Sequence, residues 1–324
     1  MEESYTIILN DKAVLSALCG ANDKNLSNLE NYVGAPVVCR GNELSVLSSD
    51  DAVCRKFHHI VNKAVSSPEI TAKNSGEYLQ ALIAVAANNG AECSNEFELN
   101  CIHIPRGSRS VYPKNRRQLD FITSIKNNDI SFALGAAGTG KTYIAVACAL
   151  EMLMAHRMRK IVLTRPVVEA GESLGFLPGD LVQKITPYLR PLYDTIEFLL
   201  PPELIRQMEE SNMIEVAPLA YMRGRTLHNS IVILDEAQNT TKEQMKMFLT
   251  RMGEGSKLII TGDPSQSDIP STKNSGLTHA AHLLKNIRGI GLIEFLPEDV
   301  VRHSLVQKII TAYERYALQS KPAL

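Results

Sequence analysis

The chain has 324 residues, enough for about two domains, and 44% of them are hydrophobic and 21% charged. This composition is ordinary for a globular protein and excludes a chain that is disordered over most of its length. The formal net charge is −1, so the chain as a whole does not attract nucleic acid, and any surface that binds nucleic acid must come from a local basic cluster.

Nothing in the sequence predicts export or membrane insertion. The acidic start Met1-Glu2-Glu3-Ser4 is not followed by the apolar segment of a secretory signal, and no apolar run reaches the length of a membrane span. The six cysteines show neither a C-x-x-C pair nor metal-ligand spacing, so we expect reduced thiols, several of them buried. We expect a cytoplasmic protein without a membrane partner.

Residues 1–100 are predicted to form a small α/β module. The expected elements are a strand at 5–9, helices at 12–18 and 26–32, a hairpin of 37–39 with 44–47, and helices at 51–65 and 75–88. The initial order β-α-α-β-β-α resembles that of the KH domain of RNA-binding proteins. A KH domain clamps nucleic-acid backbone with a G-x-x-G loop, but Gly20-Ala21-Asn22-Asp23 lacks the second glycine. An assembly or packing module is therefore the alternative.

Residues 101–117 are predicted to be a basic linker. No acidic residue occurs between Glu98 and Asp120. The positive charges in this segment are Arg106, Arg109, Lys114, Arg116 and Arg117. Both a solvated connection and a strip that contacts RNA phosphates are consistent with this pattern.

Residues 118–324 are predicted to form an ATPase domain around a phosphate-binding loop. The pattern G-x-x-x-x-G-K-[ST] fits Gly135, Ala136, Ala137, Gly138, Thr139, Gly140, Lys141 and Thr142, between an apolar strand at 130–134 and a helix at 143–154. The glycines let successive backbone N–H groups face a polyphosphate at the N-terminus of the helix. We expect Lys141 to reach the β and γ phosphates of ATP, and Thr142 to bind Mg²⁺.

Two acids follow a later strand of the same domain. Strands are expected at 160–164, 214–219 and 230–234, with a helical region at 180–210, as a parallel sheet with crossover helices requires. Asp235 would hold Mg²⁺ through its water shell, and Glu236 would activate the attacking water. Thr240 and Glu243 are expected to form a capping box for the next helix.

A further strand at 257–261 leads into Gly262-Asp263-Pro264-Ser265-Gln266, where Gln266 could contact the γ-phosphate. The order of phosphate loop, D-E-A-Q and G-D-x-x-Q resembles the first three core motifs of superfamily 1 helicases. This resemblance implies one RecA-like P-loop NTPase core, with a parallel sheet and helices on both faces. It also implies that Gln118 lies against the adenine ring.

Longer motifs resemble the PhoH-like ATPases over essentially the whole chain. They are Thr164-Arg165-Pro166, the segments 169–180, 187–194 and 221–226, the block from Asp235 and the run Asp299-Val300-Val301-Arg302-His303. The resemblance implies an ATP-binding, ATP-hydrolysing cytoplasmic protein linked to phosphate starvation and RNA metabolism. It further implies a partnership with the endoribonuclease that matures ribosomal RNA.

The length leaves room for only one RecA-type lobe after the N-terminal module. An arginine finger must therefore come from a neighbouring subunit in a homo-oligomeric ring, which we favour, or from Arg302 in cis. Other cations predicted at a subunit boundary or an RNA path, or else as ordinary surface charges, are Arg165, Lys184, Arg190, Arg223 and Arg225. Two functions remain open: an RNA-remodelling or unwinding ATPase, and a nucleotide-switched binding module with little turnover. A small-molecule kinase is less favoured.

Overall fold

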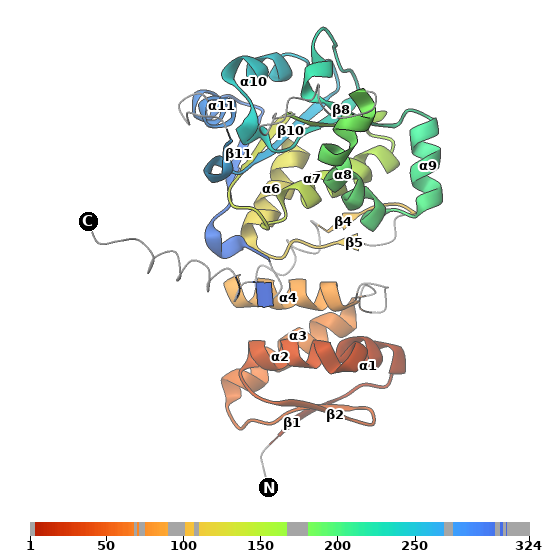
Figure 1. The fold of residues 1–324 in the computed structure, drawn as a ribbon. Coiled ribbons are helices and arrows are strands. Elements are labelled where there is room, and N and C mark those ends of the chain that lie inside the picture. The colour runs from red at the N-terminus through yellow and green to blue at the C-terminus, as the bar shows by residue number, and fades with distance from the viewer. Residues whose placement is uncertain are drawn as a thin grey trace, which may run out of the picture.

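A computed structural model describes residues 4–67, 70, 75–89, 101–106, 110–166, 181–268, 275–301, 305–306 and 309. Figure 1 shows a small N-terminal module below a larger α/β unit, with helix α4 (Ser75–Asn89) on the side of the module that faces the larger unit. Within the described part of the chain, no helix is both long and apolar enough to cross a membrane.

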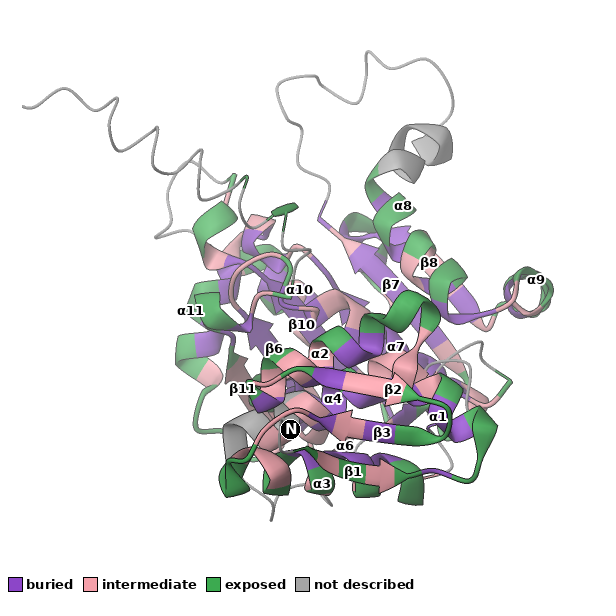
Figure 2. Ribbon diagram, turned by 90° about the horizontal axis from the view of Figure 1, so that it is seen from below, coloured by how far each residue is buried: buried purple, intermediate pink, exposed green. Residues whose placement is uncertain are grey.

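The N-terminal module has the predicted element order. Its elements are β1 (Tyr5–Ile8), α1 (Lys12–Cys19), α2 (Lys24–Val33), β2 (Val37–Arg40), β3 (Glu43–Val46) and α3 (Asp51–Ser66). The strands form an antiparallel sheet in the order β1-β3-β2, which Figure 2 shows in front of the module's helices. The module has its own core, because the helices bury residues such as Leu18, Leu29 and Phe57 against Leu44 of the sheet.

The larger unit contains a six-stranded parallel sheet in the order β11-β6-β10-β9-β7-β8. Its strands are β6 (Ile130–Leu134), β7 (Lys160–Arg165), β8 (Ile214–Pro218), β9 (Ser230–Leu234), β10 (Lys257–Gly262) and β11 (Ile290–Glu294). Strands β6, β7, β9 and β10 are almost wholly buried because helices cover both faces of the sheet.

Alternate residues of the strands enter two separate cores. Ile231 and Ile233 of β9 pack toward one face, and Val232 and Leu234 toward the other. The first face is covered by α6 (Arg116–Asn127), α7 (Lys141–Met154), α8 (Leu181–Leu199) and α9 (Pro202–Glu210). The second is covered by α10 (Lys242–Leu249) and α11 (Gly276–Leu284). The predicted RecA-like P-loop architecture is thereby confirmed.

The predicted capping box at Thr240 and Glu243 is wrong by one residue. Thr241 is the N-cap of α10, and its hydroxyl and backbone N–H pair with the backbone N–H and side chain of Gln244. Thr240 is buried and donates to the carbonyl of Ala237, so it closes the preceding turn instead of capping the helix.

The segment predicted as a basic linker contributes to both cores. Strands β4 (Ile102–His103) and β5 (Ser110–Val111) pair, and Ile102 and Val111 are buried in the core that contains α7. Tyr112, the next residue, packs in the core of the N-terminal module. Among the described cysteines, all are free thiols, and only Cys148 is fully buried, so the prediction of several buried thiols holds for this one.

Candidate nucleotide-binding site

The phosphate loop turns sharply between β6 and α7 because glycines stand at its tight positions. Gly135 has φ 141° and Gly140 has φ 84°, a region that favours glycine. A Cβ on Gly135 would lie 2.3 Å from the backbone oxygen of Phe295, and one on Gly140 would lie 2.9 Å from Nε2 of Gln118. Gly135 is therefore required by conformation and by a backbone contact, whereas Gly140 is required by conformation.

Lys141 is the first residue of α7, and its side chain is buried against the backbone of the loop. Its Nζ donates to the carbonyls of Gly135 at 2.6 Å and Ala136 at 2.7 Å. Burial lowers the pKa of Lys141, and the negative charges of Asp263, Asp235 and Glu236 oppose this shift. The ammonium group therefore lies at the loop, where the phosphate chain of a nucleotide would bind.

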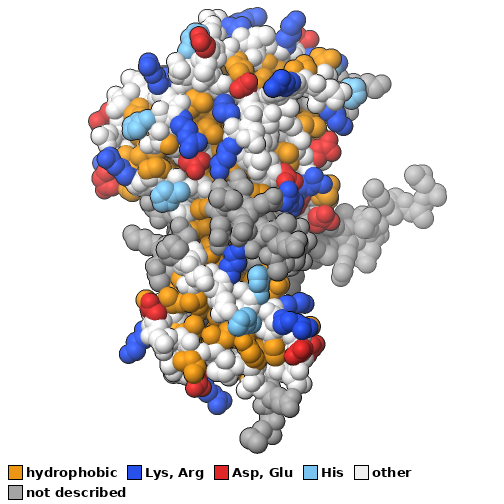
Figure 3. All heavy atoms as spheres, turned by 180° about the vertical axis from the view of Figure 1, so that it is seen from behind, with side chains coloured by type: hydrophobic (Ala, Val, Ile, Leu, Met, Phe, Trp, Pro, Cys, Tyr) orange, Lys and Arg blue, Asp and Glu red, His pale blue; other side chains and the backbone are white. Residues whose placement is uncertain are grey.

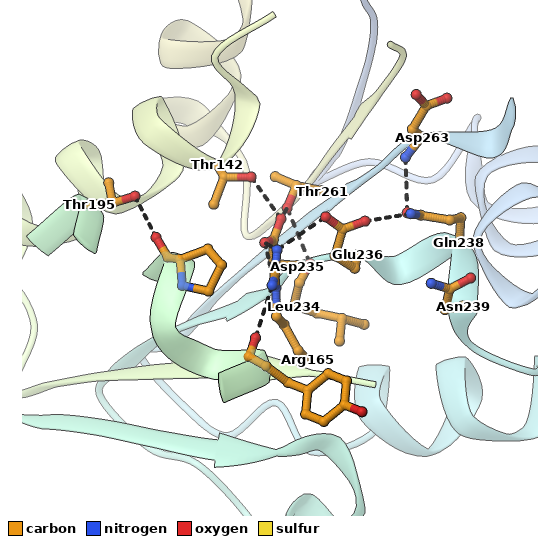
Figure 4. A network of polar contacts seen from close by, with 12 residues as sticks. Thr142, Arg165, Thr195, Leu234, Asp235, Glu236, Gln238, Asn239, Thr261 and Asp263 are labelled. Atoms are coloured by element: carbon orange, nitrogen blue, oxygen red, sulfur yellow. Dashed lines mark hydrogen bonds and ion pairs between the residues drawn. The ribbon is translucent and has the colours of Figure 1, made fainter. Parts of the chain in front are cut away.

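Asp235 lies at the carboxyl end of β9, the position where open α/β sheets bind ligands. Its Oδ1 accepts hydrogen bonds from the hydroxyls of Thr142 and Thr261, both at 2.7 Å. Figure 4 shows these groups converging on the Asp235 carboxylate. A hydroxyl and a carboxylate beside the phosphate loop are the hard oxygen donors that Mg²⁺ prefers, so these residues fit the ion.

Glu236 follows in a left-handed backbone conformation, with φ 54°. Its Oε1 accepts from Nη2 of Arg165 at 3.1 Å, and its Oε2 accepts from Nε2 of Gln238. The side chain is 44% exposed and lines the cavity, so it is accessible to a water molecule beside the phosphates.

The predicted residues surround one cavity of about 320 Å³, which falls in the size range of small-molecule sites. The structure brings Lys141, Thr142, Asp235, Glu236 and Gln266 together at its wall. The described residues that line the cavity are Ala137, Gly138, Gly140, Lys141, Thr142, Tyr143, Arg165, Pro191, Thr195, Asp235, Glu236, Gly262, Asp263 and Gln266.

Two charged residues of this wall, Asp263 and Arg165, were not assigned to the site from the sequence. Asp263 accepts a hydrogen bond from the backbone N–H of Ala137 at 3.1 Å, and its own N–H donates to Gln238 at 3.0 Å, so it joins the loop to the D-E-A-Q turn. Arg165, expected at a subunit boundary or an RNA path, instead pairs with Asp235 at 2.8 Å inside the site. The signal for both was their position just after a strand, at the sheet edge where ligands collect.

Gln118 is buried beneath the loop, outside the cavity lining. Its Nε2 donates to the carbonyl of Thr139 at 3.0 Å, and its Oε1 accepts from the N–H of Lys114 at 2.7 Å. The side chain thus braces the phosphate loop, and its contact with adenine stays a prediction. Arg302 lies outside the described residues, although the N–H of Val301 donates to the carbonyl of Gly138 at 2.9 Å.

The remaining predicted cations divide into three groups. Arg190 pairs with Asp194 and Glu197, and Arg225 pairs with Glu215. Arg223 is exposed. The structure does not describe the side chain of Lys184 or any part of Arg109. The motif at 169–180 also lies outside the described residues. Figure 3 shows Lys and Arg side chains on one face of both units with Asp and Glu among them, so the described residues of this face form no continuous basic surface.

The parallel sheet, the glycine loop and the acids at the end of β9 define a P-loop NTPase. The family model described as PhoH-like protein matches residues 110–314. The chain therefore belongs to the PhoH-like family, whose P-loop fold supports nucleotide binding and hydrolysis.

Two bacterial relatives match almost the full length of the chain. The PhoH-like protein of Synechocystis sp. is 44% identical over 307 residues, which are 95% of this chain and 93% of that one. The PhoH-like protein of Bacillus subtilis is 43% identical over 313 residues, covering 92% and 93%. Among solved structures, the Sulfolobus solfataricus SWI2/SNF2 ATPase core in complex with dsDNA is similar at a TM-score of 0.34 and 11% identity, covering 57% of this chain and 45% of that one. That last similarity is too weak to carry an argument.

Proposed function

We propose that this protein hydrolyses ATP with Mg²⁺ at the cavity around the phosphate loop. The observation that carries the proposal is the meeting of Lys141, Thr142, Asp235 and Glu236 at one cavity wall. These residues supply a cation for the phosphates, two oxygen groups for a metal ion and a carboxylate for water.

The chain's own groups each take one part of the reaction. The N–H groups of the loop and the Lys141 ammonium bind the phosphate oxygens. Mg²⁺, when bound through Thr142 and Asp235, stabilises the negative charge of the phosphates. Glu236 accepts a hydrogen bond from water and orients it toward the γ-phosphate. Gln266, at the cavity wall, contacts the phosphate that is released.

We further propose that hydrolysis serves the remodelling or unwinding of RNA. The support is the KH-like element order of the N-terminal module and the basic residues beside the loop. Lys114 is part of this basic segment, and its backbone N–H donates to Gln118, which in turn donates to the carbonyl of Thr139 in the loop. The proposal extends to a homo-oligomeric ring. In the ring, the arginine finger comes from a neighbouring subunit, or else from Arg302 of the same chain. The proposed protein partner is the endoribonuclease that matures ribosomal RNA.

The test is steady-state phosphate release from ATP and Mg²⁺, with and without single-stranded RNA. Because a positioned base contributes about 100-fold or more to a rate, Glu236→Gln should lower turnover by that factor and preserve binding of a fluorescent ATP analogue. Glu243→Gln, an acid on α10 outside the nucleotide cavity, is the matched control and should keep the wild-type rate.

A second candidate function is a nucleotide-switched RNA-binding or assembly module with little turnover. The observation that favours it is that both carboxylate oxygens of Glu236 already accept hydrogen bonds from the chain. In this case phosphate release stays near zero and does not respond to RNA, while ATP changes the affinity for RNA. A wild-type rate that RNA raises and Glu236→Gln abolishes excludes the switch.

A further inference from the structure

The last residue of β7, Arg165, lies beside the two acids because of strand register. Strands β7 and β9 are parallel neighbours with Thr164 opposite Leu234, and the N–H of Asp235 donates to the carbonyl of Thr164 at 2.9 Å. Arg165 and Asp235 therefore leave the sheet side by side. The Arg165 side chain is only 15% exposed, so its guanidinium is held among its partners and not in solvent.

Every nitrogen of this guanidinium has an acceptor. Nε donates to Oδ2 of Asp235 at 2.9 Å, and Nη2 lies 2.8 Å from the same oxygen and 3.1 Å from Oε1 of Glu236. Nη1 donates to the carbonyl of Tyr188 on α8 at 2.9 Å. Figure 4 shows the group between the acids and α8. Only the planar fork of arginine offers donors in all these directions, because lysine has a single nitrogen.

The two acids need to be held in different ways. Glu236 has a left-handed backbone conformation, and Gln238 donates to its second carboxylate oxygen. Gln238 is itself fixed by the N–H of Asp263. The first oxygen of Glu236 depends on Arg165, and so does Oδ2 of Asp235, while Thr142 and Thr261 hold Oδ1.

We propose that Arg165 is a positioning residue that fixes the metal-holding Asp235 and the base Glu236 relative to each other and to α8. This inference rests on the proposed ATP hydrolysis. Helix α8 contributes Pro191 and Thr195 to the cavity wall. The hydrogen bond from Arg165 to the carbonyl of Tyr188 therefore fixes this part of the wall relative to the two acids. Arg165 acts through these side chains and does not itself react.

The primary test is Arg165→Lys, which keeps the charge and removes the fork. A displacement of about 1 Å in a catalytic group costs on the order of 100-fold, so kcat should fall by that factor. The KM for ATP should change by less than about threefold, because Lys141 and the loop N–H groups still hold the nucleotide. Arg251→Gln is the matched control: Arg251 is a partly buried arginine that bonds to the carbonyls of Met247 and Arg225 outside the cavity, and its loss should leave both constants unchanged.

A second measurement does not depend on turnover. Loss of a group that orients a metal ligand lowers metal affinity by about 10-fold or more, so Arg165→Lys should weaken Mn²⁺ binding to the ADP complex, as followed by electron paramagnetic resonance. Unchanged or tighter Mn²⁺ binding would show that Arg165 only neutralises the acids, and would overturn the proposal.

Chemical rescue and a double variant complete the design. Millimolar guanidinium should restore activity to Arg165→Ala but not to Glu236→Gln, since only the former leaves a space shaped for guanidinium.

In a Glu236→Gln background, Arg165→Lys should lower kcat by less than about threefold, because the two residues act together. A wild-type protein that releases no phosphate contradicts the proposed function, whereas an active wild type with an equally active Arg165→Lys contradicts only the role of Arg165.

Discussion

At the scale of single residues, Gly135 shows how tightly the phosphate loop is packed against the segment that follows β11. Its added Cβ would meet the backbone oxygen and the Cβ of Phe295, and backbone atoms cannot turn aside as a flexible side chain can. Two backbone hydrogen bonds join the segment after β11 to the loop region. The N–H of Phe295 donates to the carbonyl of Leu134 at 2.7 Å, and the N–H of Val301 donates to the carbonyl of Gly138 at 2.9 Å. Any residue larger than glycine must therefore displace this segment or the loop.

We expect Gly135→Ala to weaken nucleotide binding by at least about 10-fold and to lower stability by more than the cost of a strained backbone alone, which is about 1–2 kcal/mol. Titration with a fluorescent ATP analogue and thermal unfolding measure the two effects. Gly41→Ala is the control, since Gly41 also has a positive φ of 66° but a Cβ there meets nothing within 4 Å. If the two variants behave alike, the contact with Phe295 is unimportant.

At the scale of elements, an ion-pair cluster fixes the turn after the edge strand β8. Glu215 accepts from both Nη1 and Nη2 of Arg225, and from Lys160 at 2.6 Å. These bonds, led by that to Arg225, lower the pKa of Glu215 from 4.5 to about 2. The cluster therefore joins β7, β8 and the segment that leads into β9.

The sign of the pH effect follows from this depressed pKa. Glu215 contributes stability above its unfolded pKa of 4.5, and this contribution is lost as the pH falls toward about 2. We expect Glu215→Gln to destabilise the protein at pH 7 by about 1–2 kcal/mol, a value reduced for the partial exposure of these side chains. The difference from wild type, measured by urea unfolding, should shrink between pH 4.5 and pH 3. If the difference in unfolding free energy between the two proteins does not change with pH, the shape of the Glu215 side chain, and not its charge, holds the turn.

Local patterns in the sequence were sufficient to predict the elements that carry the site. The strand before Gly135, the glycine loop and the apolar strand before Asp235 each show their structure within a few residues. The same local information misplaced the cap of α10, because Thr240 and Thr241 are chemically equivalent until the turn before them is known. Strand β11 was not predicted, since it contains a glycine and no fully buried residue.

Contacts between distant segments could not be predicted in this way. The role of Arg165 depends on β7 lying beside β9, and the sequence does not state the order of strands in a sheet. The bracing of Thr139 by Gln118 likewise joins α6 to the loop, and α6 itself was not predicted. The motifs thus indicated that Thr142 and Asp235 meet at one site, but not that Arg165 joins the acids or that Gln118 contacts Thr139.

At the scale of the whole molecule, two adjacent residues join the N-terminal module to the ATPase unit. Val111 is buried in the core beneath α7, whereas Tyr112 is buried in the core of the module, with its ring 5.4 Å from that of Tyr78 on α4. Successive side chains of an extended segment point to opposite sides, so one short stretch anchors two cores. Among the described residues, this stretch is a direct packed connection through which a change in one unit can reach the other.

We expect Tyr112→Ala to lower the stability of the N-terminal module by about 3 kcal/mol, the cost of deleting a buried aromatic side chain, and to spare the ATPase unit. Calorimetry of the whole chain should show an earlier first transition, and ADP should raise only the second, because the nucleotide binds one unit. Val111→Ala should affect the second transition instead, and Tyr112→Phe, which keeps the ring, should change little. If Tyr112→Ala shifts a single transition that ADP raises as a whole, the units unfold together. A ligand bound to the module would then influence the phosphate loop through a shared core, and no hinge between the units would be needed.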